Sequence, residues 1–305
     1  MRIFVTGASG WIGSAVVPDL LAAGHEVIGL ARSDRAAETV AGLGAAVHRG
    51  SLDDLDSLRA AAAGADGVVH LGYHHDFSQM AEAARIDRRA VQLFGEVLAG
   101  TGGPLVVASG VLGIGGGGHP ATESDMPDPT IHPRIATGEL VLSLAERRVR
   151  TAVVRFAPTV HGPGDQGFVA TLVELARRTG IAGYIGDGSN RWPAVHRLDA
   201  ATLVQLAVDS APAGSVLHAV DEEGIATRDI AEAIGRSLGV PAQSVAADRA
   251  AEHFGWIGGF FGMDSAASSI RTRELLGWVP AHPGLVDDLD AGRYRDAAPH
   301  STAGG

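Results

Sequence analysis

The sequence contains no cysteine, and none of its 24 basic residues is lysine, so every one of them is arginine. The absence of cysteine excludes a disulfide scaffold, a thiol nucleophile, an iron–sulfur cluster and Cys-ligated zinc. Any redox chemistry must therefore use a bound cofactor. The absence of lysine removes one kind of cationic side chain from whatever site the protein has.

Basic residues and apolar segments suited to a membrane helix are also scarce. Asp and Glu total 35 against 24 basic residues, a formal net charge of −11, so the basic surface that nucleic-acid binding requires is missing. The longest stretch without formal charge, 97–122, contains nine Gly and two Pro and is unsuited to a membrane helix. No secretory signal follows Met1. We expect a cytoplasmic protein that binds neither nucleic acid nor membrane.

Short apolar runs typical of β-strands alternate with stretches of helical periodicity through the first half of the 305-residue chain. This alternation predicts an α/β fold, a Rossmann-type doubly wound parallel sheet with helices on both faces. The predicted strands span 3–6, 26–30, 46–48, 67–71, 105–108 and 151–156. The predicted helices span 11–23, 35–42, 54–63, 78–99 and 133–147.

Beyond residue 156 the alternation weakens into loops rich in Gly, Pro and His. We expect residues 1–160 to form a dinucleotide-binding domain, with its sheet completed by about 193–220. Residues 161–192 and 221–296 are predicted to form a smaller, interleaved C-terminal substrate lobe. Its helices are expected near 227–238, 248–254 and 265–276, and 297–305 has the composition of a flexible tail.

A glycine-rich turn follows the first strand and opens the first helix, the place where such a turn binds phosphate. Gly7 permits the tight turn, Gly10 lets the backbone approach a pyrophosphate, and Gly13 lets the helix and strand pack closely. The turn therefore predicts a dinucleotide site. The other cofactor contacts expected from position in the fold are Ser9, Trp11, Ile12, Ser51, Leu52, Leu71, Gly72, Pro158 and Val160.

The end of the second strand bears on the choice of cofactor. Enzymes that bind NAD usually have Asp or Glu there for the ribose hydroxyls, and this chain has Arg32 and Ser33 instead. Arg32 is placed to bind a 2′-phosphate through charge-assisted hydrogen bonds, with Ser33 and Arg35 in support. The alternative is a solvated surface arginine. We favour NADP over NAD.

Several motifs together resemble the extended short-chain dehydrogenase/reductase superfamily, whose members include NAD-dependent epimerases and dehydratases. The resemblance covers about residues 1–289, and only the first motif is specific on its own. The motifs are Thr6-Gly7-x-x-Gly10-x-x-Gly13, Gly50-Ser51-Leu52-Asp53, Val106-Val107-Ala108-Ser109-Gly110, the segment 154–165 and the segment 193–199.

The resemblance implies a hydride transfer in which a Ser hydroxyl and a Tyr phenol hold a carbonyl, while a Lys four residues after the Tyr lowers the phenol's pKa. In this chain Arg134 stands where the Tyr belongs and Gly138 where the Lys belongs. A free phenol has a pKa near 10, poorly matched to neutral pH without a cationic neighbour. The sequence is therefore that of an atypical member that lacks the Tyr/Lys pair.

Four residues are candidates for the chemistry. Ser109, the family residue that remains, could hydrogen-bond a substrate oxygen or only local backbone. Arg134 could polarise a carbonyl, or simply face solvent at a helix start. Tyr73, in the run Tyr73-His74-His75-Asp76 after the fourth strand, could take part in proton transfer. His161 lies in a loop expected to pass the nicotinamide, where a histidine is more often structural than catalytic.

Other features describe the partners. No metal-ligand spacing occurs among the 13 histidines, so we predict no metal. The second lobe is rich in aromatic residues, which pack its core by default and, where they line a pocket, predict a partly apolar small-molecule substrate. They are Trp192, Phe254, Trp256, Phe260 and Phe261. The sequence is compatible with a homodimer.

Three functions fit these features. The first is an NADP-dependent oxidoreductase that transfers hydride to or from a small C=O or C=N substrate with a noncanonical site. The second is an NADP-dependent epimerase, isomerase or lyase with the same cofactor site. The third is a non-catalytic NADP-binding sensor, for which loss of the catalytic pair is the expected signature.

Overall fold

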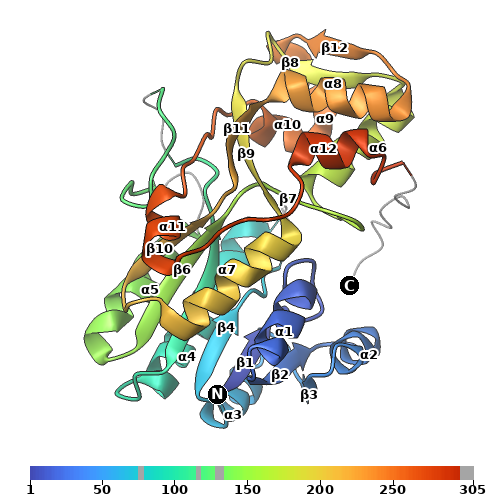
Figure 1. The fold of residues 1–305 in the computed structure, drawn as a ribbon. Helices are drawn as coiled ribbons and strands as arrows, with labels where there is room; N and C mark the ends of the chain where they lie inside the picture. Colours follow the sequence, from blue (N-terminus) through green and yellow to red (C-terminus); the bar gives the residue numbers. More distant parts are fainter. Residues whose placement is uncertain (75–78, 115–117, 128–133, 296–305) are drawn as a thin grey trace.

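The computed structural model describes residues 1–74, 79–114, 118–127 and 134–295. It has a larger unit built on a seven-stranded parallel sheet and a smaller lobe at one end of that sheet (Figure 1). The strand order is β10-β6-β5-β4-β1-β2-β3. The predicted Rossmann-type fold is confirmed. The strands are β1 (Arg2–Thr6), β2 (Glu26–Ala31), β3 (Ala46–Arg49), β4 (Gly67–His70), β5 (Pro104–Gly110), β6 (Arg150–Phe156) and β10 (Ser215–Ala219).

Helices cover both faces of this sheet because its central strands are apolar on both sides, as in β4, where all four residues are buried. One face packs against α1 (Gly13–Ala22) and α7 (Arg197–Ser210), with α2 (Asp34–Gly42) at its edge. The other face packs against α3 (Leu55–Ala63), α4 (Met80–Leu98) and α5 (Ile135–Ser143).

The chain builds the sheet outward in both directions from β1 and β4. β1 pairs with β2 on one side and with β4 on the other, with Thr6 opposite His70 at the carboxyl ends. A ligand-binding crevice forms outside the carboxyl ends of parallel strands where the order reverses in this way. The strand order therefore puts the glycine-rich turn and the residues after β4 at one edge.

The smaller lobe has its own core and two short sheets. One has the order β11-β9-β7 and the other pairs β12 with β8. Its strands are β7 (Thr159–His161), β8 (Ala182–Ile185), β9 (Arg191–His196), β11 (Glu222–Ala226) and β12 (Ala242–Val245). Its helices are α6 (Phe168–Thr179), α8 (Thr227–Leu238), α9 (Ala250–Phe254), α10 (Gly258–Phe261) and α12 (Leu285–Asp290).

The sequence analysis did not predict α6. Its signal was present, since Val169, Val173 and Ala176 recur at helical spacing on one buried face. Gly180, with φ +76°, ends the helix in the left-handed conformation that glycine adopts without strain. The surrounding Gly, Pro and His obscured this period.

The two units exchange segments more than once. β9 belongs to the three-stranded sheet rather than to the large one, so the return to the large sheet consists of α7 and β10. Helix α11 (Ile270–Leu276) packs beside β10, and Trp278 is buried in the core of the larger unit (Figure 1). The chain re-enters the smaller lobe at α12. The predicted lobe boundary of 221–296 therefore includes a segment that packs on the larger unit.

The predicted tail, 297–305, lies outside the described residues. Within the described part of the chain, no helix combines the length and the apolar character needed to cross a membrane.

Candidate active site

The glycine-rich turn is held by contacts that account for two of its three glycines. Gly7 has φ +69°, and a Cβ on it would lie 2.7 Å from the backbone nitrogen of Gly72. A Cβ on Gly13 would lie 2.1 Å from the carbonyl oxygen of Gly7. Neither position admits a side chain, because the atoms in the way are backbone. These two glycines fix the turn against β4 and helix α1.

Gly10 is different because it is exposed and a Cβ there would approach only the Gly7 oxygen, at 3.1 Å. That contact is tight, but no other atom outside the neighbouring residues lies within 4 Å, so the space beside Gly10 is open to a ligand. Among the described residues no acceptor is found for the N–H groups of Trp11 and Ile12 at the start of α1. Exposed backbone, free donors and a helix N-terminus fit a dinucleotide pyrophosphate.

The residues predicted to select NADP over NAD lie at the end of β2. Arg32 is exposed there, and Ser33 is the N-cap of α2, with its Oγ accepting a hydrogen bond from the Ala36 N–H at 3.2 Å. Asp34, next along, forms an ion pair with Arg49. The Ser33 hydroxyl is therefore already used by the helix, and the guanidinium of Arg32 remains the main feature that distinguishes this end of the site.

The cofactor contacts predicted after β3 lie next to it, since the Gly50 N–H donates to the Ala31 carbonyl oxygen at 3.2 Å. Ser51 is half-buried and Leu52 is buried, with Leu52 Cδ1 3.3 Å from the position of a Cβ on Gly72. Asp53 forms an ion pair with His74, Nε2 to Oδ2 at 3.4 Å. Leu71 and Gly72 follow β4 directly, beside the glycine-rich turn. The predicted contacts from three separate loops therefore meet at one edge of the sheet.

The segment after β6 is the predicted nicotinamide side of the site. Trp11 donates its indole N–H to the carbonyl oxygen of Val160 at 2.8 Å, and Arg197 lies 4.3 Å above the Trp11 ring. Pro158, half-buried, and Val160, buried, are thereby joined to the glycine-rich turn. Ser9 and Ile12 complete the turn, both half-buried. Side chains between the two units thus close this end of the predicted cofactor site.

Two of the predicted catalytic residues lie in direct contact. The guanidinium carbon of Arg134, immediately before α5, is 4.3 Å from the ring centroid of Tyr73, which follows β4. A cation above a phenol ring is an attractive arrangement. Burial raises the pKa of Tyr73, and the charge of Arg134 opposes that rise. His75 and Asp76 from the same run lie outside the described residues.

Arg134 is held in place by a buried carboxylate that the sequence analysis missed. Asp87, on α4, is 1% exposed, and its Oδ1 lies 3.3 Å from Arg134 Nη2 and 3.3 Å from His70 Nε2. Burial alone would raise the pKa of Asp87, but the charge of Arg134 and the hydrogen bond of His70 outweigh it, so the pKa is lowered. Asp87, His70 and Arg134 are called the site cluster below.

The site cluster continues to the glycine-rich turn. His70 Nδ1 lies 2.7 Å from Thr6 Oγ1, and Thr6 Oγ1 accepts a hydrogen bond from the Gly72 N–H at 3.1 Å. A hydroxyl that accepts from Gly72 has its own proton free for His70 Nδ1, which puts the imidazole proton on Nε2, toward Asp87. The signal for Asp87 in the sequence was an acid between Ala83 and Val91 on the apolar face of a helix.

Ser109 lies near the carboxyl end of β5 and is half-buried. β5 pairs with β4, with Val107 opposite His70. Ser109 is two residues beyond Val107 and Tyr73 is three beyond His70, so both lie at the same edge of neighbouring strands. Ser109 therefore shares this sheet edge with Tyr73, which Arg134 contacts.

His161 occupies a different environment. It is fully buried in β7, and its Nδ1 lies 2.8 Å from Asp288 Oδ2 on α12. Arg293 Nε is 2.9 Å from the other oxygen of Asp288. Asp288, His161 and Arg293 are called the anchor cluster below. It joins the segment after β6 to the last helix of the small lobe, and this placement favours the structural interpretation of His161.

Beside the anchor cluster, His196, Asp199 and His282 have donor atoms within 4.8 Å of one another. These atoms already have partners. His196 Nδ1 accepts from the Leu198 N–H, and Asp199 accepts from the backbone N–H groups of Ala281 and His282 and pairs with His282 Nδ1 at 2.8 Å. The two imidazole rings are stacked at 4.7 Å. The group is held together without an ion, and the absence of a metal stays a prediction.

The aromatic residues of the small lobe fall into two sets. Trp192, Phe254 and Phe261 are buried in its core. Trp256 is 46% exposed and Phe260 is half-buried, both with ring centroids within 6.3 Å of Phe168. Leu112, three residues after Ser109, packs against the same core. Through Leu112, the chain just after Ser109 therefore contacts the apolar core of the small lobe.

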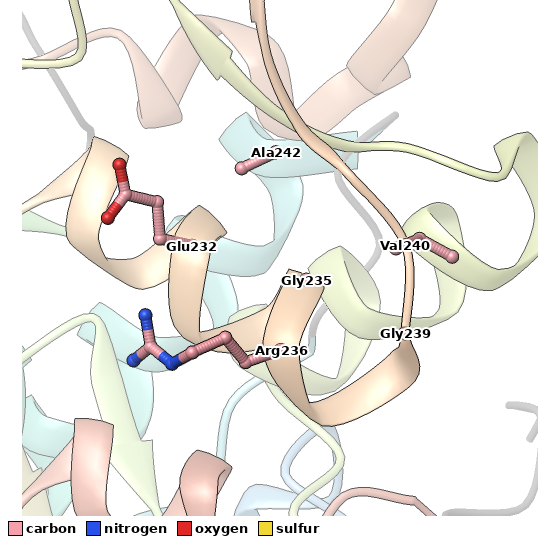
Figure 2. A pocket seen from close by; sticks show the side chains of 6 residues that line it. All are labelled: Glu232, Gly235, Arg236, Gly239, Val240 and Ala242. Atoms are coloured by element: carbon pink, nitrogen blue, oxygen red, sulfur yellow. The ribbon is translucent and has the colours of Figure 1, made fainter.

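A surface hollow of about 400 Å³ lies elsewhere, on α8 of the small lobe (Figure 2). Its lining contains one carboxylate and one guanidinium and no residue of the glycine-rich turn or of the site cluster. The lining residues are Glu232, Gly235, Arg236, Gly239, Val240 and Ala242. This hollow is separate from the candidate active site.

Comparisons with known proteins agree with the fold. An uncharacterized protein of Schizosaccharomyces pombe is 46% identical over 96% of this chain and 100% of its own length. The 2-alkyl-3-oxoalkanoate reductase of Stenotrophomonas maltophilia is 29% identical, over 79% of this chain and 77% of its own.

Solved structures give the same result at the level of the fold. The UDP-glucose 4-epimerase of Thermotoga maritima matches with a TM-score of 0.78 at 20% identity, over 96% of this chain and 97% of its own. The family model described as "NAD dependent epimerase/dehydratase family" matches residues 3–219. The chain therefore belongs to the NAD-dependent epimerase/dehydratase family, within the extended short-chain dehydrogenase/reductase superfamily.

Proposed function

We propose that the protein is an NADP-dependent oxidoreductase that transfers hydride to or from a small, partly apolar substrate with a C=O or C=N group. The observation that carries this proposal is the Arg134 guanidinium, held by Asp87 and lying over Tyr73 at the carboxyl edge of the sheet. The relative named as a 2-alkyl-3-oxoalkanoate reductase supports a carbonyl substrate with an apolar part.

The cofactor supplies the hydride, and this chain's residues bind and orient. The N–H groups at the start of α1 face the pyrophosphate, and Gly10 leaves room for it. The guanidinium of Arg32 binds the 2′-phosphate, with Arg35 nearby. No acidic side chain occurs from Val27 to Ser33 to bind a free 2′-hydroxyl in its place. These features support NADP over NAD.

On the substrate side, hydrogen-bond donors of the protein contact the carbonyl oxygen, where negative charge develops during the reaction. Ser109 donates its hydroxyl proton, and Arg134 donates from a guanidinium whose position is fixed before substrate arrives. Because Asp87 offsets much of the Arg134 charge, the guanidinium acts as an oriented donor more than as a free cation. We assign the apolar part of the substrate to the small lobe, whose aromatic residues include the exposed Trp256.

The decisive experiment follows the absorbance of NADPH and NADH with a panel of ketones, aldehydes and imines. Oxidation of NADPH in preference to NADH with at least one substrate supports the proposal. Gly10→Val should remove cofactor binding in a folded protein, because its side chain fills the phosphate space. Gly42→Val is the matched control, since Gly42 in α2 has no heavy atom within 4 Å of a Cβ position.

Two other outcomes would replace the proposal. Interconversion of a substrate with no net change in the cofactor would identify an epimerase, isomerase or lyase, a group that includes the UDP-glucose 4-epimerases among the structural neighbours. Tight NADP(H) binding with no turnover of any substrate would identify a sensor. A cytoplasmic location, a homodimer and the absence of nucleic-acid, membrane and metal partners stay predictions.

A further inference from the structure

We propose that Tyr73 delivers the proton to the substrate oxygen, that Arg134 is the cation that stabilises its phenolate, and that Asp87 is a positioning residue for this pair. The inference rests on the proposed function. It replaces the missing Tyr/Lys pair of one helix with a pair from two elements, the end of β4 and the start of α5.

The placement of the other two tyrosines leaves Tyr73 as the phenol at this edge. Tyr294 is buried under the small lobe, where its hydroxyl donates to Asp165 at 2.9 Å. Tyr184 lies in β8 of the small lobe, beside Arg228. Tyr73, in contrast, follows Gly72, which borders the glycine-rich turn and hence the cofactor site.

The contact with Arg134 suits a phenol that loses a proton. A guanidinium 4.3 Å from the ring centroid attracts the phenolate more strongly than the neutral phenol, because deprotonation adds negative charge to the ring and oxygen. Burial raises the pKa of Tyr73, the charge of Arg134 lowers it, and that of Asp87 raises it. The phenol is therefore protonated at neutral pH and able to donate.

One network, made of an ion pair and several hydrogen bonds, positions both members of the pair. Asp87 holds the side chain of Arg134, and His70 holds Asp87. On its other side His70 contacts Thr6, whose Oγ1 accepts from the N–H of Gly72, the residue before Tyr73. The network thus fixes the Arg134 side chain and the backbone at Tyr73 together, and it begins in the turn that binds the cofactor.

The charged and titratable groups that face Tyr73 come from three directions. Arg134 precedes α5, Asp87 projects from α4, and His70 lies below on β4. His74, next in the chain, is paired with Asp53 from the loop after β3. Arg134 and Asp87 are the two that act on the ionisation of Tyr73.

The step balances as follows. Bound NADPH would supply the hydride and become NADP⁺, a C–H bond would form at the substrate carbon, and the π bond of the C=O group would break toward oxygen. That oxygen takes the proton of Tyr73 Oη, which leaves an alcohol and a phenolate beside Arg134. Water then returns a proton to Tyr73. Oxidation runs through the same steps in reverse.

The first test measures the ionisation of Tyr73 directly. Phenolate formation is followed by ultraviolet difference absorbance during an alkaline titration. With only three tyrosines in the chain, the difference between parent and Tyr73→Phe isolates Tyr73. Arg134→Gln should raise the pKa of Tyr73, and Asp87→Asn should lower it. Arg228→Gln, which removes the cation beside Tyr184, is the matched control and should leave Tyr73 unchanged.

The second test is kinetic and uses the conservative variant Tyr73→Phe, which keeps the ring under Arg134. Its kcat should fall by about 10²–10⁴-fold, the usual contribution of a general acid, with NADPH affinity unchanged. Tyr184→Phe should keep parental kcat. Fluorotyrosine at position 73, which has a more acidic phenol, should move the alkaline limb of the pH–rate profile to lower pH.

The outcomes separate this inference from the function on which it rests. Carbonyl reduction by the parent with full turnover in Tyr73→Phe overturns the role of Tyr73 and leaves the proposed function intact. A Tyr73 titration that is the same in Arg134→Gln as in the parent overturns the role of Arg134. A parent that reduces no carbonyl or imine overturns both proposals. Should Asp87→Asn fail to fold, the Arg134→Gln and Tyr73→Phe results still decide.

Discussion

Two clusters of the same three residue types are found among the described residues, each built around a buried carboxylate. In the site cluster Asp87 lies between His70 and Arg134, and in the anchor cluster Asp288 lies between His161 and Arg293. Both carboxylates are almost fully buried, at 1% and 0% exposure. The composition of the two clusters therefore does not distinguish their roles.

Their surroundings do distinguish them. The Arg134 guanidinium contacts Tyr73 at the carboxyl edge of a parallel sheet, where ligands bind in this fold. The anchor cluster is covered by the small lobe, and the Tyr294 hydroxyl nearby donates to Asp165 and accepts from Gly162. We therefore assign the site cluster, at the sheet edge, to the proposed chemistry, and the anchor cluster, between β7 and the end of α12, to packing within the small lobe.

Removing the anchor carboxylate should give the largest effect on stability. Asp288→Ala leaves His161 and Arg293 without their anion, and breaking a buried pair typically costs about 3–5 kcal/mol. Asp290→Ala, on the same helix, removes an exposed pair with Arg236 and should cost no more than about 1 kcal/mol. Urea unfolding measures both. Equal losses would mean that Asp288 is not an anchor.

Removing the site arginine should have a large effect on turnover. An oriented donor to a developing oxyanion is typically worth about 2.7–4 kcal/mol, so Arg134→Ala should lower kcat by roughly 10²–10³. Arg293→Ala, its counterpart in the anchor cluster, should keep the kcat of the folded protein. The comparison fails if both variants lose turnover alike.

The pH–rate profile adds a check on His161. A histidine proton donor would add a limb in the range where histidines commonly titrate, about pH 6–7, and if that donor were His161 the limb would be lost in His161→Ala. Donation by Tyr73 gives no limb in that range. We therefore expect a profile that is flat around pH 6–7 in both the parent and His161→Ala.

Acid should weaken the packing of β10 against the residues before and within α11. Burial lowers the pKa of His218, on β10, from 6.5 to about 4, and it also lowers the pKa of His196 beside the anchor cluster. A folded state that binds protons less readily than the unfolded state loses stability as pH falls, here between about 6.5 and 4. The loss from His218 should be at most about 3 kcal/mol.

The measurement is urea unfolding across that pH range, in the parent and in His218→Gln. The variant should show a smaller loss on acidification, because it lacks the group that takes up the proton on unfolding. A parental slope in His218→Gln would assign the acid sensitivity to other groups.

The smallest expected effect lies far from both clusters. Arg32→Ala should weaken NADP(H) binding by roughly 1.5–3 kcal/mol, the value of hydrogen bonds to a charged group, with little change for NAD(H). Arg59→Ala, an exposed arginine paired with Glu96, is the control. Titration with both dinucleotides checks this. Equal weakening of NADP and NAD, or tighter NAD in the parent, would rule out the assignment.

Local patterns in the sequence predicted most of the larger unit because its elements obey local rules. Apolar runs gave β1 to β6, and Ser33 and Asp54 cap α2 and α3 as their residue types favour. The small lobe was harder, since its helices and strands alternate with glycine turns and the chain returns twice to the larger unit. Its segments acquire their partners from residues more than 100 positions away, as His161 does from Asp288.

The sequence by itself determined the fold class, the glycine-rich turn and the absence of the Tyr/Lys pair, because strand and helix periods, backbone freedom and residue identity are local properties. Only the tertiary structure decided that Arg134 lies over Tyr73, that Asp87 holds it, and that His161 is buried against α12. The physical reason is that an ion pair or a stacked ring depends on distance in space. No periodicity along the chain encodes the meeting of α4, α5 and the end of β4.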